Sequence, residues 1–365
     1  MGIESVPDRM LACQVIEYHK PYKIHEVPTP KDLDEWDILV KPAVSSLCHT
    51  DSMVVNGDFK TKLPCTASHE GSGTVVAVGS SVKDFKEGDR VMCGISYHKC
   101  GVCHDCQTPD TQYCHKNLNT GVTRDGNFAE YVAVDSRSSA KMPDAVSFQT
   151  AAPLACAGCT VYRAVLTAEC HAGEWLAIVG SGGGLGHLGC QFAKALGINV
   201  IGIDARDEGL ALSKECGADV VIDARKGEDE VIKKVQSVTG GEGVKATVNV
   251  SDAESAAELA CAVTMMHGTM VQVAQPARVS VPFVEFVFRD VRIKGSLVCN
   301  PTEARQMLDV VAQHGISVKT NPVNGLNEIP KLVELAHSGK MSGKGVVIVD
   351  QSQLDEDKKH GRGTI

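Results

Sequence analysis

Four cysteines stand close together in the chain and could share one metal ion. Cys100, Cys103 and Cys106 are each separated by two residues, and Cys114 follows soon after. Thiolates at this spacing can turn back onto one ion, and four of them complete a tetrahedral zinc shell with no open position. Such a site stabilises a loop and does not catalyse. Four metal-free thiols are the alternative, whereas a redox pair fits two overlapping Cys-x-x-Cys units poorly.

A second set of metal-binding side chains is scattered along the chain. Taken singly, each is more often structural. Together, Cys48, His69 and Cys156 supply two thiolates and an imidazole, the ligand set of a catalytic zinc whose fourth position stays open. Zinc there lowers the pKa of a hydroxyl group that it binds. We expect Asp51 to accept a hydrogen bond from the second ring nitrogen of His69. Glu70 either approaches the metal or pairs with a basic residue.

A glycine-rich turn at residues 180–186 is the third chemical signal. It follows an apolar run and opens a helical pattern, so its backbone could approach a pyrophosphate at the helix N-terminus, although the strict G-x-G-x-x-G spacing is not met. Asp204 ends the next predicted strand, where a carboxylate binds ribose hydroxyls and repels a 2′-phosphate. This favours NAD over NADP, and the nearby Arg206 weakens that preference. The expected contacts are Gly180, Gly182, Gly183, Gly184, Leu185, Gly186 and Asp204.

The elements that must position these side chains fall into two patterns. Residues 1–157 alternate short apolar runs with turn signals, which predicts short strands in an irregular barrel. From residue 175 onward strand and helix patterns alternate, which predicts a parallel sheet covered on both faces. After residue 300 the chain is expected to return to the first domain. Strands are expected at 176–179, 200–203, 220–222, 246–250, 270–273 and 345–349, and helices at 185–196, 210–216 and 301–313.

Composition limits the possible functions and partners. Lys and Arg number 36 and Asp and Glu 45, so the net charge of −9 disfavours a nucleic-acid binder. An odd count of 15 cysteines in a chain of 365 residues indicates a reducing cytoplasm and not a disulfide framework. We find neither a secretory signal nor an apolar stretch long enough to span a bilayer. We therefore expect a cytoplasmic protein with no membrane or nucleic-acid partner.

Together these residues resemble the zinc-dependent medium-chain alcohol dehydrogenase family, and within it the fungal, yeast-type branch. The order and spacing of Cys48-His49-Thr50-Asp51, His69-Glu70-Gly71, the four-cysteine stretch, Cys156-Ala157-Gly158 and the glycine-rich turn carry the resemblance, which covers nearly the whole chain. It implies an α/β fold with a GroES-like irregular β-barrel catalytic domain, residues 1–157 and 301–365. A doubly wound Rossmann NAD-binding domain would occupy residues 158–300.

The resemblance also implies roles for single residues. Thr50 would pass the substrate hydroxyl proton through a cofactor ribose, and His49 and Lys344 would touch the pyrophosphate, with Val273 as a further cofactor contact. Two zinc ions and NAD would be bound by each chain. The catalytic residues would be Cys48, Thr50, Asp51, His69, Glu70 and Cys156, and the structural zinc ligands Cys100, Cys103, Cys106 and Cys114.

Four positions depart from the family pattern. Met53 stands where the family's proton relay ends in a histidine, so we predict that proton release uses water or another group. Val55 and Ile95 fall near positions where ethanol-active relatives carry tryptophans, and Gln275 replaces an apolar residue close to the nicotinamide. These changes predict a substrate larger and more polar than ethanol, unless other side chains refill the pocket.

We therefore expect an NAD-dependent zinc alcohol dehydrogenase or aldehyde reductase that acts on a small-molecule substrate as a homotetramer or, as a second choice, a dimer. A polyol or sugar-alcohol dehydrogenase of the same superfamily is one alternative. A zinc-free quinone reductase of the same fold would not need the seven metal ligands found here. A zinc-ribbon protein that recognises nucleic acid would need a basic face, against the net charge of −9.

Overall fold

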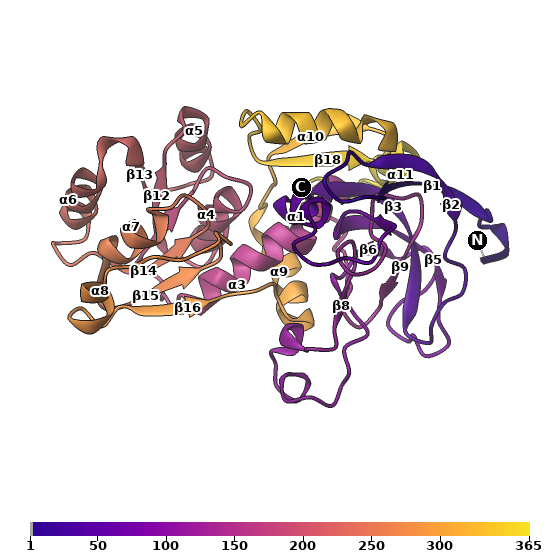
Figure 1. Cartoon of the computed structure of the whole chain (residues 1–365), viewed down its shortest axis with the longest axis horizontal. Helices are drawn as coiled ribbons and strands as arrows, with labels where there is room; N and C mark the ends of the chain where they lie inside the picture. Colours follow the sequence, from indigo (N-terminus) through magenta and orange to yellow (C-terminus); the bar gives the residue numbers. More distant parts are fainter. Residues whose placement is uncertain (1–2) are drawn as a thin grey trace. The chain divides into compact units, whose positions relative to one another are not determined.

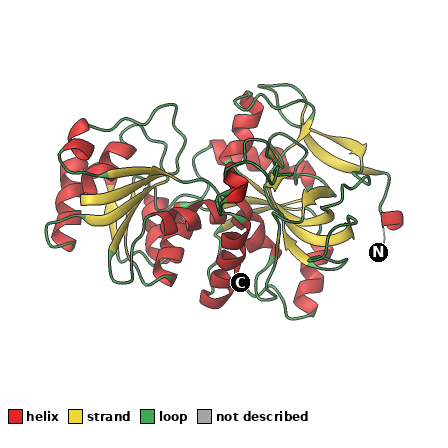
Figure 2. Ribbon diagram, turned by 90° about the horizontal axis from the view of Figure 1, so that it is seen from below, coloured by secondary structure: helices red, strands yellow, loops and turns green. Residues whose placement is uncertain are grey.

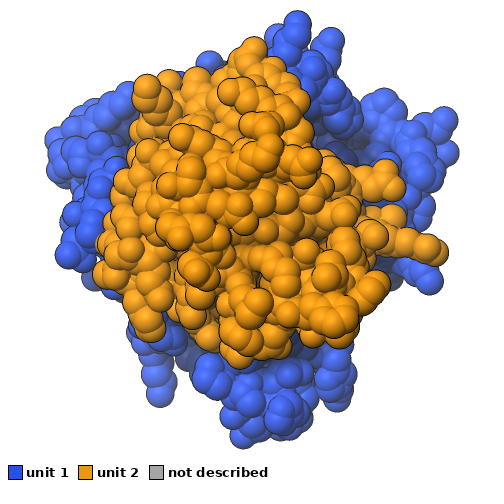
Figure 3. Space-filling model, turned by 90° about the vertical axis from the view of Figure 1, so that its left-hand side faces the viewer, with its two compact units in different colours: residues 1–156, 300–365 blue, residues 157–299 orange. Residues whose placement is uncertain are grey.

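The structure, a computed structural model, describes residues 3–365 and divides into two compact units (Figure 3). Unit 1 comprises residues Met1–Cys156 and Asn300–Ile365, and unit 2 comprises Ala157–Cys299. These borders lie one residue before those expected from the sequence. The chain therefore leaves unit 1 once, builds unit 2 from a continuous segment, and returns.

Unit 2 is built on a six-stranded sheet in which every neighbouring pair is parallel. In the strand order β13-β12-β11-β14-β15-β16, the first strand of the unit, β11, lies in the middle of the sheet. Later strands are added first on one side of β11 and then on the other, as in a doubly wound dinucleotide-binding sheet. Figure 2 shows helices on both sides of this sheet. The strands are β11 (Trp175–Val179), β12 (Asn199–Asp204), β13 (Val220–Asp223), β14 (Val244–Asn249), β15 (Thr264–Gln272) and β16 (Arg292–Gly295).

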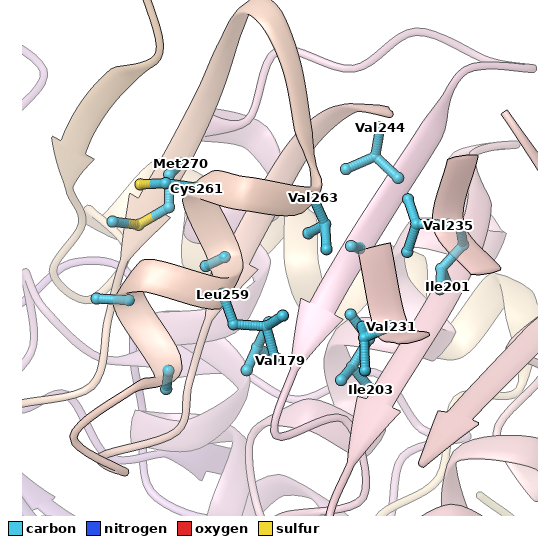
Figure 4. Packing of buried hydrophobic residues seen from close by; sticks show 14 of the residues in the cluster. Val179, Ile201, Ile203, Val231, Val235, Val244, Leu259, Cys261, Val263 and Met270 are labelled. Carbon is cyan, nitrogen blue, oxygen red and sulfur yellow. The ribbon is translucent and has the colours of Figure 1, made fainter. Parts of the chain in front are cut away.

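Alternating residues of the central strands pack into two separate hydrophobic cores of unit 2, one on each face of the sheet. Val179, Ile201 and Ile203 pack with Val231 and Leu259 on one face (Figure 4), whereas their strand neighbours pack on the other face. Both faces must be apolar, which explains the continuous apolar runs in the sequence. The helices are α3 (Cys159–Thr167), α4 (Gly186–Ala195), α5 (Asp207–Glu215), α6 (Glu228–Val238), α7 (Ala256–Val263) and α8 (Phe283–Val287), with a 3-10 turn at Ala224–Lys226.

Unit 1 is a set of small, mostly antiparallel sheets. The largest has the order β10-β6-β5-β3-β18-β17, with β9 also paired to β3, and two smaller sheets have the orders β2-β1-β4 and β7-β8. The strands are β1 (Arg9–Val15), β2 (Lys23–Pro28), β3 (Asp37–Leu47), β4 (Cys65–Thr66), β5 (Glu70–Val78), β6 (Arg90–Met92), β7 (Ser96–Tyr97), β8 (Leu118–Asn119), β9 (Val132–Asp135), β10 (Ala140–Lys141), β17 (Thr320–Asn324) and β18 (Lys344–Ile348).

The C-terminal segment completes the barrel of unit 1, because β18 lies beside β3 in the largest sheet (Figure 1). Its helix α9 begins with a capping box, in which the side chains of Asn300 and Glu303 each accept a hydrogen bond from the backbone N–H of the other residue. The helix ends at Gly315, whose backbone is in the left-handed region. The helices of unit 1 are α1 (His49–Asn56), α2 (Phe148–Pro153), α9 (Pro301–His314), α10 (Ile329–His337) and α11 (Gln351–Lys359), and a π-helical turn spans Leu154–Gly158. Its 3-10 turns are Ile3–Ser5, Asp105–Gln107, Thr111–Tyr113 and Leu326–Glu328.

Strand β15 and helix α6 are among the elements that differ from the sequence expectation, each for a physical reason. Strand β15 begins at Thr264 instead of residue 270, because Met266 and His267 are exposed and hide the strand pattern. Helix α6 is not expected from the sequence, because most of its residues are polar or charged. It buries only Val231 and Val235, one turn apart, which is too few to mark an apolar face.

Candidate metal and cofactor sites

Four side chains from three distant parts of unit 1 converge on one point. The sulfur atoms of Cys48 and Cys156, a ring nitrogen of His69 and a carboxylate oxygen of Glu70 all lie within 4.8 Å of one another. Cys48 follows the long central strand β3 and caps α1, whereas His69 directly precedes β5. Cys156 lies in the π-helical turn, where the extra residue per turn displaces the backbone from a regular helix. The three-ligand set predicted from the sequence is therefore assembled by the fold.

Asp51 holds two of these ligand segments in place through the backbone. Its carboxylate accepts hydrogen bonds from the backbone N–H of Cys48 at 2.8 Å and of Ser68 at 3.0 Å. Burial raises the pKa of Asp51 to about 6, although these hydrogen bonds oppose the rise. The expected hydrogen bond from the His69 ring is absent, because both carboxylate oxygens face backbone donors. Within residues 3–365, Nδ1 of His69 has no hydrogen-bond partner.

Ser68 is a positioning residue that the sequence analysis missed. Its backbone is in the left-handed region, with φ of 70°, which turns the chain between β4 and β5. The hydroxyl donates to the Ser46 carbonyl at 2.9 Å and accepts from the Glu70 backbone N–H at 3.2 Å. It thus joins β3 to the segment that carries His69. A serine before a histidine is too common a pair to have signalled this role.

Glu70 meets both expectations from the sequence, because it lies near the proposed metal position and pairs with a basic residue. Its carboxylate lies within the ligand cluster and also binds the Lys344 ammonium, with Oε1 at 3.0 Å and Oε2 at 2.8 Å. Both side chains are buried, with exposed fractions of 0% for Glu70 and 6% for Lys344. Burial raises the pKa of Glu70 to about 7 against the lowering effect of the ammonium. Lys344, expected as a pyrophosphate contact, has Glu70 as its partner in this structure.

The electrostatic surroundings favour a thiolate at Cys48. The neighbouring Cys156 thiol, the Lys344 ammonium and the His69 ring hold the pKa of Cys48 well below its ordinary value. Thr50, the expected proton carrier, lies beside this sulfur, with Oγ1 at 3.7 Å from Cys48 Sγ. Two thiolates and an imidazole are donors that zinc prefers, so the cluster fits a zinc ion with a fourth position for Glu70 or another oxygen ligand.

The four cysteines of the loop after β7 also form one cluster. Their sulfur atoms lie within 4.8 Å of one another, with separations of 3.6 Å between Cys114 and Cys100 and 4.0 Å between Cys100 and Cys106. A tetrahedron with zinc–sulfur bonds of about 2.3 Å has edges of roughly 3.8 Å, which lies between these two values. Backbone N–H groups of Val102 and Cys103 lower the pKa of Cys100 to about 6. The loop therefore matches an all-sulfur zinc site.

The glycine-rich turn joins β11 to α4 in unit 2, and two glycines are required by close approaches. Gly180 has φ of 87°, which an L side chain rarely adopts. A Cβ atom on Gly182 would lie 2.0 Å from the Gly209 carbonyl oxygen, at the start of α5. Helix α4 begins without a side-chain cap, and its N-terminal dipole would favour an anion, although the His187 and Leu188 N–H groups already donate to the Gly183 and Leu185 carbonyls. The turn therefore fits a pyrophosphate.

Asp204 closes this turn from the end of β12. Its carboxylate accepts hydrogen bonds from the Gly182 backbone N–H at 2.9 Å and from the Arg206 backbone N–H at 3.0 Å. The Arg206 guanidinium lies 3.6 Å from the same carboxylate and is 42% exposed. A groove lined by Gly180, Gly183, Asp204, Arg206, Arg225, Ser251, Asp252 and Leu259 continues from the turn along the strand ends.

The remaining predicted residues occupy different environments. His49 is exposed at the start of α1, and Gln275 is exposed after β15. Val55 is partly buried against a small cluster that contains Val15 and Val122. Gly184, Leu185 and Gly186 lead into α4, Ile95 is partly buried, and Val273 is buried.

Two dehydrogenase family models match this chain. The model described as alcohol dehydrogenase GroES-like domain matches residues 34–144, and that described as zinc-binding dehydrogenase matches residues 184–313. An alcohol dehydrogenase of Geobacillus stearothermophilus is 37% identical over 93% of this chain and 98% of the relative. A second alcohol dehydrogenase of that organism is 34% identical over 93% of this chain and its own full length. The crystal structure of an alcohol dehydrogenase from Aeropyrum pernix superposes with a TM-score of 0.85 at 31% identity, covering 93% and 99% of the two chains.

A doubly wound unit inserted in a GroES-like barrel that gathers two cysteines, a histidine and a four-cysteine loop defines a zinc-binding dehydrogenase. The chain belongs to the zinc-type medium-chain alcohol dehydrogenase family and is an oxidoreductase, which sets aside the zinc-ribbon alternative. Among residues 3–365, no helix is long and apolar enough to cross a membrane.

Proposed function

We propose that this protein is an NAD-dependent zinc alcohol dehydrogenase or aldehyde reductase. The single observation that supports this most is the convergence of Cys48, His69 and Cys156 beside the buried Glu70–Lys344 pair. When bound there, zinc would polarise the substrate oxygen, and NAD would exchange the hydride with the substrate carbon. Thr50 lies next to Cys48 and could carry the hydroxyl proton. A second zinc in the four-cysteine loop would be structural.

NAD is the proposed cofactor because of the charge at the end of β12. The Asp204 side chain is buried beside the groove, where a carboxylate would repel a 2′-phosphate. The Arg206 side chain is 42% exposed and pairs with the same carboxylate, which reduces its attraction for a phosphate. The expected result is a higher kcat/KM with NAD than with NADP, and the reverse preference would refute the assignment.

The substrate is proposed to be larger than ethanol. Val55 and Ile95 would leave more room where ethanol-active relatives carry tryptophans, and Gln275 would place an amide where an apolar residue is usual. A panel of ethanol, a cyclic alcohol, an aromatic alcohol and a polyol should give the highest kcat/KM for a cyclic or aromatic alcohol. A preference for ethanol would overturn this part, and a preference for the polyol would support the sugar-alcohol alternative.

Metal analysis tests the zinc assignment directly. We expect about two zinc ions per chain, one of them lost in Cys48→Ser together with activity and the other lost in Cys103→Ser. Cys170→Ser is the matched control, because Cys170 lies in unit 2 outside both clusters and should leave both zinc ions bound. A chain with full activity and no zinc would instead be a zinc-free reductase.

We also propose a cytoplasmic homo-oligomer, a tetramer before a dimer, of the fungal branch of the family. Within residues 3–365 no disulfide joins two cysteines, which is typical of a reducing compartment. Strand β16 is an edge of its sheet. Helix α8 and the residue after it expose Phe283, Val287 and Phe288 by 61–68%, which suits a surface covered by a second copy. Light scattering should give at least the dimer mass, and Phe288→Asp should reduce it.

A further inference from the structure

A third group of metal-binding side chains lies in unit 1, apart from the two clusters already described. One carboxylate oxygen each from Asp34 and Asp37 and a ring nitrogen of His98 lie within 4.8 Å of one another. Asp34 and Asp37 stand at the two ends of the turn that leads into β3, and His98 directly follows β7. Neither the sequence spacing nor the dehydrogenase chemistry assigns a role to this group.

Asp37 supplies the observation that indicates a missing partner. Its side chain is 2% exposed, and its Oδ2 accepts hydrogen bonds from the Tyr97 hydroxyl at 2.8 Å and the Asp34 backbone N–H at 3.2 Å. Its Oδ1 is buried and has no hydrogen-bond partner, although Nε2 of His98 lies only 3.3 Å away. A buried carboxylate oxygen without a donor is costly, so this oxygen calls for a cation or a better-aligned proton donor.

The imidazole of His98 is held in place by its surroundings. Its ring stacks on Tyr97 with 3.8 Å between centroids, and its backbone N–H donates to Asp135 Oδ2 at 3.0 Å. The backbone at His98 is in the left-handed region, with φ of 51°, which only a minority of residues adopt. The ring therefore points its Nε2 at both aspartates, with Asp34 Oδ2 at 3.7 Å.

The local charge also favours a cation. Within residues 3–365, the His98 ring is the one basic side chain that comes within ion-pair distance of Asp34 or Asp37. The Arg124 guanidinium lies over Tyr97, the ring stacked on His98, at 3.3 Å from the ring centre. Arg137 is already paired with Asp135 at 2.6 Å. Two carboxylates thus share one imidazole and one tyrosine hydroxyl.

We propose that Asp34, Asp37 and His98 form a third metal site that binds a labile divalent first-row cation. Two carboxylate oxygens and one imidazole nitrogen are a mixed donor set that suits Mn²⁺ and Zn²⁺, with water on the open side next to the exposed Asp34. The ion binds Asp37 Oδ1, which has no hydrogen-bond partner. It thereby connects the turn before β3 to His98, which directly follows β7. It takes no part in hydride transfer.

Manganese is the sharpest probe for this site. Because Mn²⁺ is the weakest binder in the divalent series, it does not displace zinc from thiolate sites. The full-length protein, with its zinc left in place, is titrated with Mn²⁺ while the electron paramagnetic resonance signal of free Mn²⁺ is recorded. We expect one Mn²⁺ bound per chain, its release on addition of Zn²⁺, and a rise in the thermal midpoint with Mn²⁺.

The variants separate this site from general carboxylate binding. Asp34→Asn keeps the shape of an exposed side chain, and His98→Asn suits the left-handed backbone, so both should fold. Each should weaken Mn²⁺ binding at least about tenfold and abolish the thermal shift. Asp32→Asn, which removes an exposed charge two residues away, is the matched control and should bind like the parent.

Three results would overturn the site. The first is no Mn²⁺ binding by the parent protein up to about 1 mM, the weakest range of dedicated protein sites. The second is unchanged binding in Asp34→Asn and His98→Asn, which would place the ion elsewhere. The third is equal weakening in Asp32→Asn, which would reduce the effect to surface charge. Circular dichroism of each variant without Mn²⁺ confirms that the loss is not unfolding.

Discussion

At the scale of single residues, the buried pair of Glu70 and Lys344 sets the charge around the proposed zinc ligands. A carboxylate that is fully enclosed needs a cation or a proton, and Lys344 supplies the cation from a strand 274 positions away. The same ammonium lowers the pKa of the Cys48 thiol. Its loss would therefore affect both the stability of unit 1 and the ligand set.

Replacing Lys344 tests this account. Lys344→Met leaves the Glu70 carboxylate buried without a partner, so we expect the free energy of unfolding of unit 1 to fall by roughly 3–5 kcal/mol. Urea unfolding can be followed by Trp36 fluorescence in a Trp175→Phe background, because Trp36 belongs to unit 1. The double variant Glu70→Gln with Lys344→Met should recover part of the loss. An additive loss in the double variant would show that the pair does not interact.

The position of Met53 in α1 gives a second test at this scale. A thioether cannot accept a proton, whereas a histidine titrates near neutral pH. We expect Met53→His to change the pH dependence of single-turnover hydride transfer, and Met53→Leu, the matched control of similar size, to leave it unchanged. An identical pH profile in Met53→His would mean that the missing relay residue has no effect on proton release.

At the scale of elements, the turn between β11 and α4 depends on contact between two backbones. Gly182 packs against Gly209, and its N–H binds the Asp204 carboxylate, so turn, strand and α5 are joined at one point. There is no space for a side chain there. The tight packing therefore fixes the backbone of the turn ahead of α4.

Gly182→Ala should therefore damage unit 2. Its Cβ would lie 2.0 Å from the Gly209 oxygen, and we expect a loss of about 1–3 kcal/mol in unfolding free energy together with weaker NAD binding. Trp175 fluorescence in a Trp36→Phe background reports on unit 2, and calorimetry measures NAD affinity. Gly183→Ala is the control for stability, because its Cβ meets only Gly180 O, at 3.3 Å. Equal stability of both variants would contradict the packing argument.

Elements with strong local patterns could be predicted from the sequence, and those without could not. The parallel strands of unit 2 and helix α9 have apolar runs or caps that identify them, and apart from the start of β15 their observed bounds lie within a few residues of the expected ones. The GroES-like and doubly wound architecture expected from the resemblance is confirmed. Helix α11 is different, because its sequence is mostly charged and its one buried residue, Asp357, does not mark a face.

At the scale of the whole chain, the N-terminal and C-terminal segments of unit 1 are joined by buried contacts. Asp357 of α11 binds the Arg90 guanidinium at 2.6 Å, and both side chains are nearly enclosed, with exposed fractions of 7% and 6%. The last residue, Ile365, also exchanges backbone hydrogen bonds with Ala145 and Ser147. The C-terminal segment is therefore part of the barrel and not an appended tail.

Asp357→Leu should release this segment. The Arg90 guanidinium would stay buried without its carboxylate, so we expect a loss of about 3–5 kcal/mol and faster proteolysis of the C-terminal helix. Limited proteolysis and urea unfolding with Trp36 fluorescence measure the two effects. Asp355→Leu is the matched control, because Asp355 lies exposed on the same helix and should leave both unchanged. An intact, protease-resistant Asp357→Leu protein would contradict the proposed tie.

The sequence by itself determined the chemistry that depends on neighbours along the chain. The four-cysteine spacing and the glycines before α4 act through a few backbone bonds, so their geometry follows from local composition. Only the tertiary structure decided which partner Glu70 takes, that Asp51 binds backbone N–H groups and not the His69 ring, and that Asp34 and Asp37 face His98. Partners far apart in the sequence meet only when packing brings their strands together, and no local pattern encodes that distance.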